Sequence, residues 1–282
     1  MKKTTGTNEN CGGVDLGTTT TQGAVLDPTG TAKVLPNSDG DLTTPSIVSV
    51  AGPHPVVGRA AKQDKFIEPQ HVAELYKRYM HVDPPPSLVS SPDGTQYTPI
   101  MLSAEALHYV KQSTEQLTGQ PFKKVVIGVP AYFEQTARLA TKQAGLIAGF
   151  EEVHIVDEPT LAATFYGLAK GKAAKLAVFD FGGGTFDISI IEVKEDGQIV
   201  PLAVDGDPEC GGSNIDEAIF QKVRKFVSDN GGELDPANDL AEWLELLDRC
   251  KEAKENLSRR DTAVIPLRIG TSGCRWSSPI AS

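Results

Sequence analysis

The 282-residue sequence lacks several patterns that assign a protein to a class at first sight. It has no run of about 18 apolar residues, which excludes a membrane-spanning helix. Its four cysteines form no Cys-x-x-Cys pair and lie at no zinc-site spacing from a histidine. We therefore expect scattered, reduced thiols rather than disulfides or a zinc centre.

The sequence has fewer basic than acidic residues. The 27 Lys and Arg residues are outnumbered by 37 Asp and Glu residues, for a net charge of −10, which argues against a duplex-binding face. No apolar run follows Lys2 and Lys3, so we expect no signal peptide. The sequence predicts a cytoplasmic protein with neither nucleic-acid nor membrane partners.

Two common phosphate-binding motifs are absent as well. The chain contains no Gly-x-x-x-x-Gly-Lys-Ser/Thr loop, and no strand leads through Gly-x-Gly-x-x-Gly into a helix. These absences exclude a P-loop and a dinucleotide-binding fold of the usual kind.

Strands and helices alternate along the chain, which predicts the α/β class. Residues 72–80 carry apolar side chains at helical spacing, and Ser103 is the expected cap of a helix ending near Leu117. The other expected helices are 135–148, 160–168, 214–227 and 239–257, and the expected strands are 13–16, 22–26, 125–129, 153–156, 176–179 and 186–193.

An internal repeat is the strongest feature of the sequence. Residues 14–19 read Val-Asp-Leu-Gly-Thr-Thr, and residues 179–185 read Phe-Asp-Phe-Gly-Gly-Gly-Thr. Each copy is a strand, an Asp, an apolar residue and a Gly-led, hydroxyl-rich turn that opens another strand. A supersecondary unit repeated at long spacing predicts two related lobes that face each other.

The residue types in the repeat indicate phosphate chemistry. Glycines let backbone N–H groups approach an anion, and the threonines add hydroxyl donors. Asp15 and Asp180 each close an apolar strand, which is reasonable if they hold a hydrated Mg²⁺. The two hairpins would then clamp a polyphosphate with Mg²⁺; the alternative is a pair of ordinary glycine turns with capping aspartates.

Four motifs together resemble the ATPase domain of the heat shock protein 70 family, the seventy-kilodalton heat-shock chaperones. They are Asp-Leu-Gly-Thr-Thr at 15–19, Val-Pro-Ala-Tyr-Phe at 129–133, Asp-Glu-Pro-Thr at 157–160 and Asp-Phe-Gly-Gly-Gly-Thr-Phe-Asp at 180–187. The resemblance implies an actin-like ATPase fold with duplicated, ribonuclease H-like lobes. It further implies ATP and ADP as ligands, Mg²⁺ as cofactor, ATP hydrolysis, and unfolded polypeptides and co-chaperones as partners of the intact family.

The resemblance also implies roles for individual residues. Asp15 and Asp180 would hold the waters of Mg²⁺, and Lys77 would orient the attacking water, although by itself it reads as a solvated lysine. Pro130 and Arg138 match positions that relay the nucleotide state to a neighbouring domain. The remaining catalytic positions are Glu158, Asp187 and Thr185, and the nucleotide-binding positions are Gly17, Thr18, Thr19, Gly182, Gly183, Gly184, Thr185, Gly211, Gly212, Lys254 and Ser258.

The sequence departs from the family near the adenosine-binding helix, where Lys251 replaces an acid and Glu255 is unusual. Rival interpretations on the same fold are a sugar or metabolite kinase and a filament-forming protein.

The resemblance predicts a first lobe over residues 1–170, with an outer subdomain at 37–100. A second lobe would span 171–282, with an outer subdomain at 213–268 and a disordered tail at 269–282. Because the family pattern stops there, we expect an incomplete second lobe, no peptide-binding domain, and weak ATP binding with doubtful ATPase activity.

Overall fold

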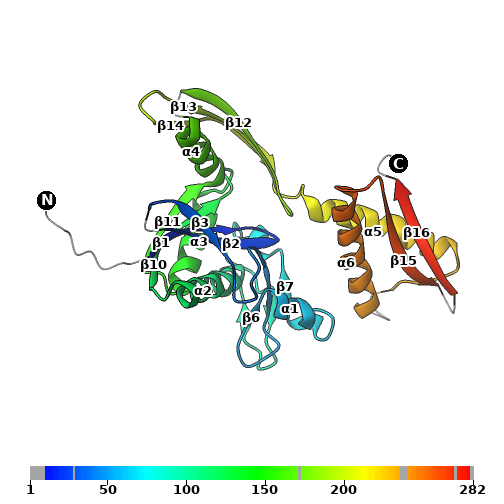
Figure 1. Ribbon diagram of the computed structural model, residues 1–282. Coiled ribbons are helices and arrows are strands. Elements are labelled where there is room, and N and C mark those ends of the chain that lie inside the picture. The colour runs from blue at the N-terminus through cyan, green and yellow to red at the C-terminus, as the bar shows by residue number, and fades with distance from the viewer. Residues whose placement is uncertain (1–9, 28, 171–172, 236–239, 270–271, 280–282) are drawn as a thin grey trace. The chain divides into compact units, whose positions relative to one another are not determined.

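The computed structural model describes residues 10–27, 29–170, 173–235, 240–269 and 272–279 (Figure 1). The chain divides into two compact units, Met1–Pro208 and Glu209–Ser282, and each is described by itself. Residues 270–271 and 280–282 of the predicted tail lie outside the described residues. None of the described helices is long and apolar enough to cross a membrane.

The first unit is built on a mixed sheet with the strand order β11-β10-β1-β2-β3. Strands β1, β10 and β11 are parallel, whereas β2 pairs antiparallel with β1, β3 and the short β4. The strands are β1 (Asn10–Leu16), β2 (Thr20–Leu26), β3 (Ala32–Leu35), β4 (Thr44–Pro45), β10 (Phe122–Val129) and β11 (Glu152–Asp157).

Helices α2 (Pro99–Thr118) and α3 (Gln135–Ile147) bury one face of this sheet. Val14 and Leu16 of β1 lie in the resulting core. Because successive side chains of a strand point to opposite faces, Asp15 between them faces the other side of the sheet. The burial of β1 therefore directs the predicted metal-binding carboxylate away from the core.

A smaller outer part joins β4 to α2. It contains a three-stranded sheet in the order β6-β5-β7, a short hairpin and two 3-10 helices. Its elements are β5 (Ile47–Ser49), β6 (Val56–Val57), α1 (Arg59–Asp64), η1 (Pro69–His71), β7 (Val72–Glu74), η2 (Tyr76–Tyr79), β8 (Val89–Ser90) and β9 (Gln96–Tyr97).

The predicted helix at residues 72–80 is wrong. Val72–Glu74 pairs with β5 as strand β7, and only Tyr76–Tyr79 is helical, as the 3-10 turn η2. Leu75 between them has φ 55° and ψ 18°, a left-handed conformation that interrupts any continuous helix. Pairing with a distant strand overrides the local helical period.

The start of α2 also differs from the sequence prediction. The helix begins at Pro99, and the Thr98 side chain accepts a hydrogen bond from the Met101 N–H at 3.4 Å. Proline at the first helical position costs no hydrogen bond, because its N–H would have no partner inside the helix. Ser103, the expected cap, is instead buried within the helix.

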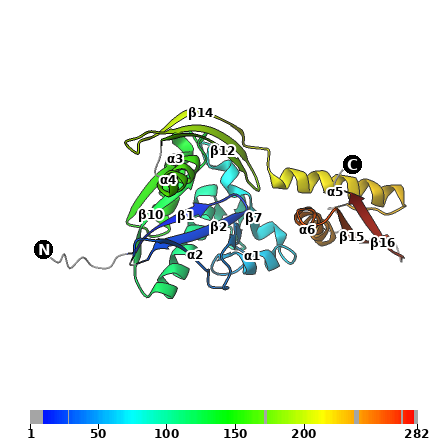
Figure 2. The ribbon, with the colours of Figure 1, turned by 45° about the horizontal axis from the view of Figure 1, so that its top comes forward.

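A second sheet in the first unit has the order β12-β13-β14 and is entirely antiparallel. Helix α4 (Glu158–Lys170) packs beneath it, with Ala163 of the helix against Ile191 and Val193 of β13 (Figure 2). The boundary between the two compact units lies after Pro208. The lobe boundary expected at residue 170 stays a prediction. The strands are β12 (Ala174–Phe181), β13 (Phe186–Val193) and β14 (Ile199–Asp207).

The second unit contains α5 (Gly212–Asp229), α6 (Leu240–Leu257) and the antiparallel pair β15 (Thr262–Ile269) and β16 (Ser272–Pro279). Phe220, Cys250 and Ile265 lie in its core. The disordered tail predicted from residue 269 is contradicted over Ser272–Pro279, which forms β16. Its main chain pairs with the polar backbone groups of β15, an interaction that needs no apolar pattern in the sequence.

Phe122 offers a test of the core of the first unit. Its ring is fully buried and meets the Phe150 ring edge-on, with centroids 5.1 Å apart. We expect Phe122→Ala to lower the free energy of unfolding by about 3–5 kcal/mol, measured by urea denaturation with circular dichroism. Phe165→Ala is the matched control, because that side chain is 77% exposed. Equal losses in the two variants would contradict the assigned core.

Candidate functional site

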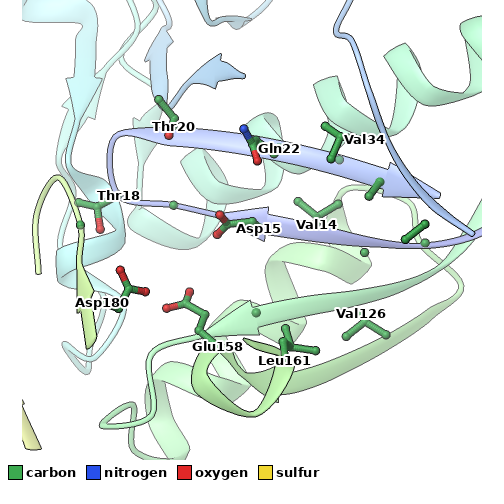
Figure 3. A pocket seen from close by; sticks show the side chains of 18 of the residues that line it. Val14, Asp15, Thr18, Thr20, Gln22, Val34, Val126, Glu158, Leu161 and Asp180 are labelled. Carbon is green, nitrogen blue, oxygen red and sulfur yellow. The ribbon is translucent and has the colours of Figure 1, made fainter. Parts of the chain in front are cut away.

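The first unit carries a cavity of about 730 Å³ on the sheet face opposite α2 and α3 (Figure 3). Strands β1, β2 and β10 form its floor, and the start of α4 and two Gly-rich turns form its rim. Ten of the residues predicted from sequence line it: Asp15, Gly17, Thr18, Thr19, Lys77, Glu158, Asp180, Gly182, Gly183 and Thr185.

The sequence repeat is a structural repeat of two hairpins. In the β1–β2 hairpin Asp15 lies opposite Gln22, and in the β12–β13 hairpin Asp180 lies opposite Asp187. The turn of the second hairpin is closed by the Gly182 N–H, which donates to the Thr185 carbonyl at 2.9 Å. The two turns have the same length and present an aspartate at the same position, as the repeat predicts.

The two turns touch each other. A Cβ atom on Gly183 would lie 2.3 Å from the Thr19 side chain, and one on Gly184 would lie 2.4 Å from Thr18. Side-chain atoms do not approach this closely, so only glycine fits at either position. Close packing of the turns is therefore a second reason for the glycines, beside the access to an anion that the sequence suggested.

Asp15, Asp180 and Glu158 point into the same space (Figure 3). Asp15 and Asp180 are open to solvent, yet the cavity walls partly desolvate both carboxylates and raise their pKa values. The negative charge of Glu158 raises both pKa values further, while the positive charge of Lys77 lowers both. The site therefore concentrates negative charge.

Asp187 is the most perturbed of these carboxyl groups. Burial, followed by the charges of Glu158 and Asp180, raises its pKa to about 6. Its Oδ1 atom is buried and accepts no hydrogen bond from the described residues. An orphaned carboxylate oxygen beside like charges fits a bound cation or a water molecule as its partner.

A magnesium ion fits this donor set. No group of three or more His, Cys, Asp and Glu side chains in the described ranges is arranged to hold a metal directly. Mg²⁺ keeps most of its waters and needs only one or two carboxylates, which Asp15 and Asp180 supply. The chemistry of the residues is therefore compatible with Mg²⁺ held through water.

Lys77 is buried, with 5% of its surface exposed, so the interpretation as a solvated lysine is wrong. Its Nζ atom lies 3.0 Å from Glu158 Oε1 and 5.8 Å from the centroid of the Phe133 ring. The left-handed Leu75 starts the 3-10 turn that carries Lys77, and β11 ends where Glu158 begins α4. Elements far apart in sequence thus supply the two partners.

The sequence did not identify Arg78 and Tyr132 as site residues. Arg78 donates from Nη2 to the Gly184 carbonyl at 2.6 Å and so fixes the second turn. Burial, together with the charges of Asp187 and Glu158, raises the pKa of Tyr132. Their only sequence signals are that Arg78 follows Lys77 and that Tyr132 lies in a quoted motif.

Arg138 contacts a neighbour of the catalytic candidate Glu158. Its Nη2 atom lies 2.5 Å from Asp157 Oδ1, and its Nε donates to the Phe133 carbonyl at 2.7 Å. Asp157 immediately precedes Glu158 at the end of β11. Pro130 follows the end of β10. The relay role of Arg138 and Pro130 stays a prediction.

The remaining nucleotide-binding candidates belong to the second unit. Gly211 caps α5, and Gly212 is its first residue. Lys254 pairs with Asp216 at 2.7 Å and donates to the Gly212 carbonyl at 2.9 Å. Ser258 is exposed just beyond α6. Contacts of these residues with a nucleotide stay predictions.

Known proteins match nearly the whole chain. The family model described as "Hsp70 protein" matches residues 11–275. The chaperone protein DnaK of Thermotoga petrophila is 39% identical over 267 residues, as are those of Thermotoga neapolitana and Thermotoga maritima. Each alignment covers 93% of this chain and 44% of the relative. The chain therefore spans less than half the length of these relatives.

The matches agree with the architecture. The mixed α/β sheets and the duplicated hairpins confirm the predicted fold class, the actin-like fold of the ATPase domain in the matched family. A metabolite kinase and a filament-forming protein are not favoured. From the extent of the family match and the identity to the three relatives, the chain belongs to the Hsp70 family.

Proposed function

We propose that this chain is an ATP-binding and ATP-hydrolysing domain of a protein-folding chaperone. The observation that carries the proposal is the convergence of two matching hairpin turns, a buried lysine and three carboxylates on one cavity. The relatives are named chaperone proteins, and this name supports unfolded polypeptides and co-chaperones as partners.

The two turns would hold the phosphates of the nucleotide. Gly17, Thr18, Thr19, Gly183 and Thr185 line the cavity, and their backbone N–H groups and threonine hydroxyls would donate to the phosphates. Such concave sets of N–H groups bind anions without any positive side chain. This mode of binding suits a chain whose net charge is −10.

Asp15 and Asp180 would hold a hydrated Mg²⁺ between the hairpins. When bound, Mg²⁺ supplies positive charge that neutralises the phosphate oxygens. Desolvation, and then the negative charge of Glu158, raise the pKa values of both carboxyl groups, and a bound cation would favour their charged forms.

Lys77, Glu158 and Asp187 would act on the attacking water. Glu158 accepts a hydrogen bond from the Lys77 ammonium, which keeps this positive charge beside the cavity. Asp187 would accept a proton or a hydrogen bond from water through its unpartnered Oδ1. The ammonium of Lys77 would stabilise charge that develops on the phosphoryl oxygens.

Four residues of the second unit are also candidates for contact with a nucleotide. Gly211, Gly212, Lys254 and Ser258 are the candidates, and ADP is the expected product. Lys254 already bonds Asp216 and the Gly212 carbonyl, so any nucleotide contact would share its ammonium with these two acceptors.

Replacement of one metal-binding carboxylate tests the site. Asp180→Asn keeps the shape of the side chain but removes a charge that the hydrated cation needs. We expect Mg·ATP to protect the variant against heat no better than ATP with EDTA does, in a thermal-shift measurement with Mg²⁺ titrated. The control is Asp205→Asn, an exposed position on β14 of the same sheet. Parental Mg·ATP protection in Asp180→Asn would refute the assignment.

Lys77→Ala separates catalysis from binding. We expect single-turnover ATP hydrolysis to fall on the order of a hundredfold or more, because the ammonium acts on charge that develops in the transition state. The affinity for ATP should change far less. Lys142→Ala, an exposed lysine on α3, is the control. Normal single-turnover hydrolysis in Lys77→Ala would show that the lysine has only a structural role.

The raised pKa of Asp187 predicts that the free energy of unfolding depends on pH in the protein without nucleotide or Mg²⁺. Its pKa is about 6 in the folded state against 3.8 for the free side chain. Between these values the folded state holds a proton that the unfolded state has lost. The contribution of Asp187 to the free energy of unfolding therefore falls as the pH rises from 3.8 to about 6.

We expect Asp187→Asn to remove this contribution to the free energy of unfolding. The difference in stability between parent and variant should therefore change between pH 3.8 and about 6. Urea denaturation at several pH values measures it. A difference that is constant with pH would contradict the raised pKa.

A further inference from the structure

A buried polar cluster lies behind the β1–β2 turn, outside the lining of the cavity. It consists of Ser46, Thr21 and Tyr76, which are 3%, 0% and 1% exposed. Buried polar groups cost free energy unless they are hydrogen-bonded, so the contacts of this cluster show what it does.

Ser46 binds the turn at two points. Its Oγ hydroxyl donates to the Gly17 carbonyl at 2.8 Å. Its backbone N–H donates to the Thr19 carbonyl, also at 2.8 Å. One residue therefore holds the two carbonyl groups that flank Thr18 in the turn.

The direction of the hydrogen bonds in the cluster is fixed. A serine hydroxyl has a single proton, and that of Ser46 goes to Gly17. The hydroxyl of Thr21, 2.9 Å from Ser46 Oγ, must therefore be the donor to Ser46. Thr21 is itself held opposite Leu16 by the register of β1 and β2. The hydroxyl of Ser46 cannot turn away without leaving the Gly17 carbonyl unpaired.

The orientation of the carbonyl groups sets the orientation of the neighbouring N–H groups. In a planar trans peptide, a C=O and the N–H that follows it point in opposite directions. The Gly17 and Thr19 carbonyls point at Ser46, so the N–H groups of Thr18 and Thr20 point away from it. Thr18 and Thr20 line the cavity (Figure 3). Ser46 thus determines which way the donors of the turn face.

The same cluster reaches the segment that carries Lys77. Burial raises the pKa of Tyr76, whose hydroxyl lies beside that of Ser46. Tyr76 is the first residue of η2 and precedes Lys77. On the other side, Ser46 follows β4, whose residues pair with Thr20 and Thr21. The serine therefore lies where the turn, β4 and η2 meet.

We propose that Ser46 is a positioning residue that holds the Gly17–Thr19 turn in its phosphate-binding conformation. The proposal rests on the proposed function, because it needs a phosphate group at this turn. Ser46 touches no ligand itself; it acts through the peptide groups of the turn.

Ser46→Ala tests the proposal against Ser49→Ala. Ser49 is also fully buried, on β5, and among the described residues its hydroxyl makes only one long hydrogen bond, 3.4 Å, from the Ala51 N–H. We expect Ser46→Ala to raise the Kd for Mg·ATP about tenfold, the effect of losing one hydrogen bond that fixes the turn. Ser49→Ala should leave this Kd within about twofold, because its hydroxyl fixes no element of the turn. The melting temperatures of the two variants should be similar.

Three further variants test the proposal if Ser46→Ala folds poorly. Ser46→Thr retains the hydroxyl and should bind Mg·ATP more tightly than Ser46→Val, which has nearly the same shape without the hydroxyl. Thr21→Val removes the donor to Ser46 and should raise the Kd in the same direction, by less. Each comparison is made between proteins whose folding is checked by circular dichroism.

The outcomes separate the inference from the function on which it rests. A parental Kd in Ser46→Ala, an equal rise in Ser49→Ala, or equal binding by the Thr and Val variants would overturn the role of Ser46 alone. No measurable Mg·ATP binding by the parent chain would overturn the proposed function and this inference with it.

Discussion

The ion pair between Lys77 and Glu158 is the interaction on which the site depends. It places one buried ammonium, 3.0 Å from its partner, among carboxyl groups whose pKa values are raised by desolvation and by one another. Like charges repel strongly where the effective dielectric constant is low. The ammonium offsets part of that repulsion, and its loss would leave Glu158 without its positive partner. A bound Mg²⁺ would offset the rest.

The backbone conformation positions these charged side chains. The left-handed conformation of Leu75 ends β7 and starts the 3-10 turn, so that Lys77 meets Glu158 and Arg78 meets the Gly184 carbonyl. Contact between the two Gly-rich turns sets the second hairpin against the first. Neighbouring residues on one short turn thus hold both the ion pair and the turn that carries the predicted phosphate donors.

Particular elements show how far the sequence could be interpreted. The repeated Asp-apolar-Gly pattern predicted both hairpins, because a turn of this kind is encoded locally by glycine and by strand propensity. The period at residues 72–80 predicted a helix that does not form, because Val72–Glu74 pairs with β5, distant in sequence. The strand Ser272–Pro279 was missed for a similar reason: its partner β15, not its own pattern, makes it a strand.

The sequence by itself determined the α/β class and the duplicated hairpins, since local spacing and residue chemistry encode both. Its resemblance to the Hsp70 family, and not local spacing, identified Lys77 and Glu158 as candidate residues. Only the tertiary structure decided that Lys77 is buried beside Glu158, that Arg78 holds the second turn, and that Ser46 holds the first. These contacts join residues 29 to 106 positions apart. Their geometry depends on how sheets and turns pack, and a pattern of neighbouring residues carries no information about that packing.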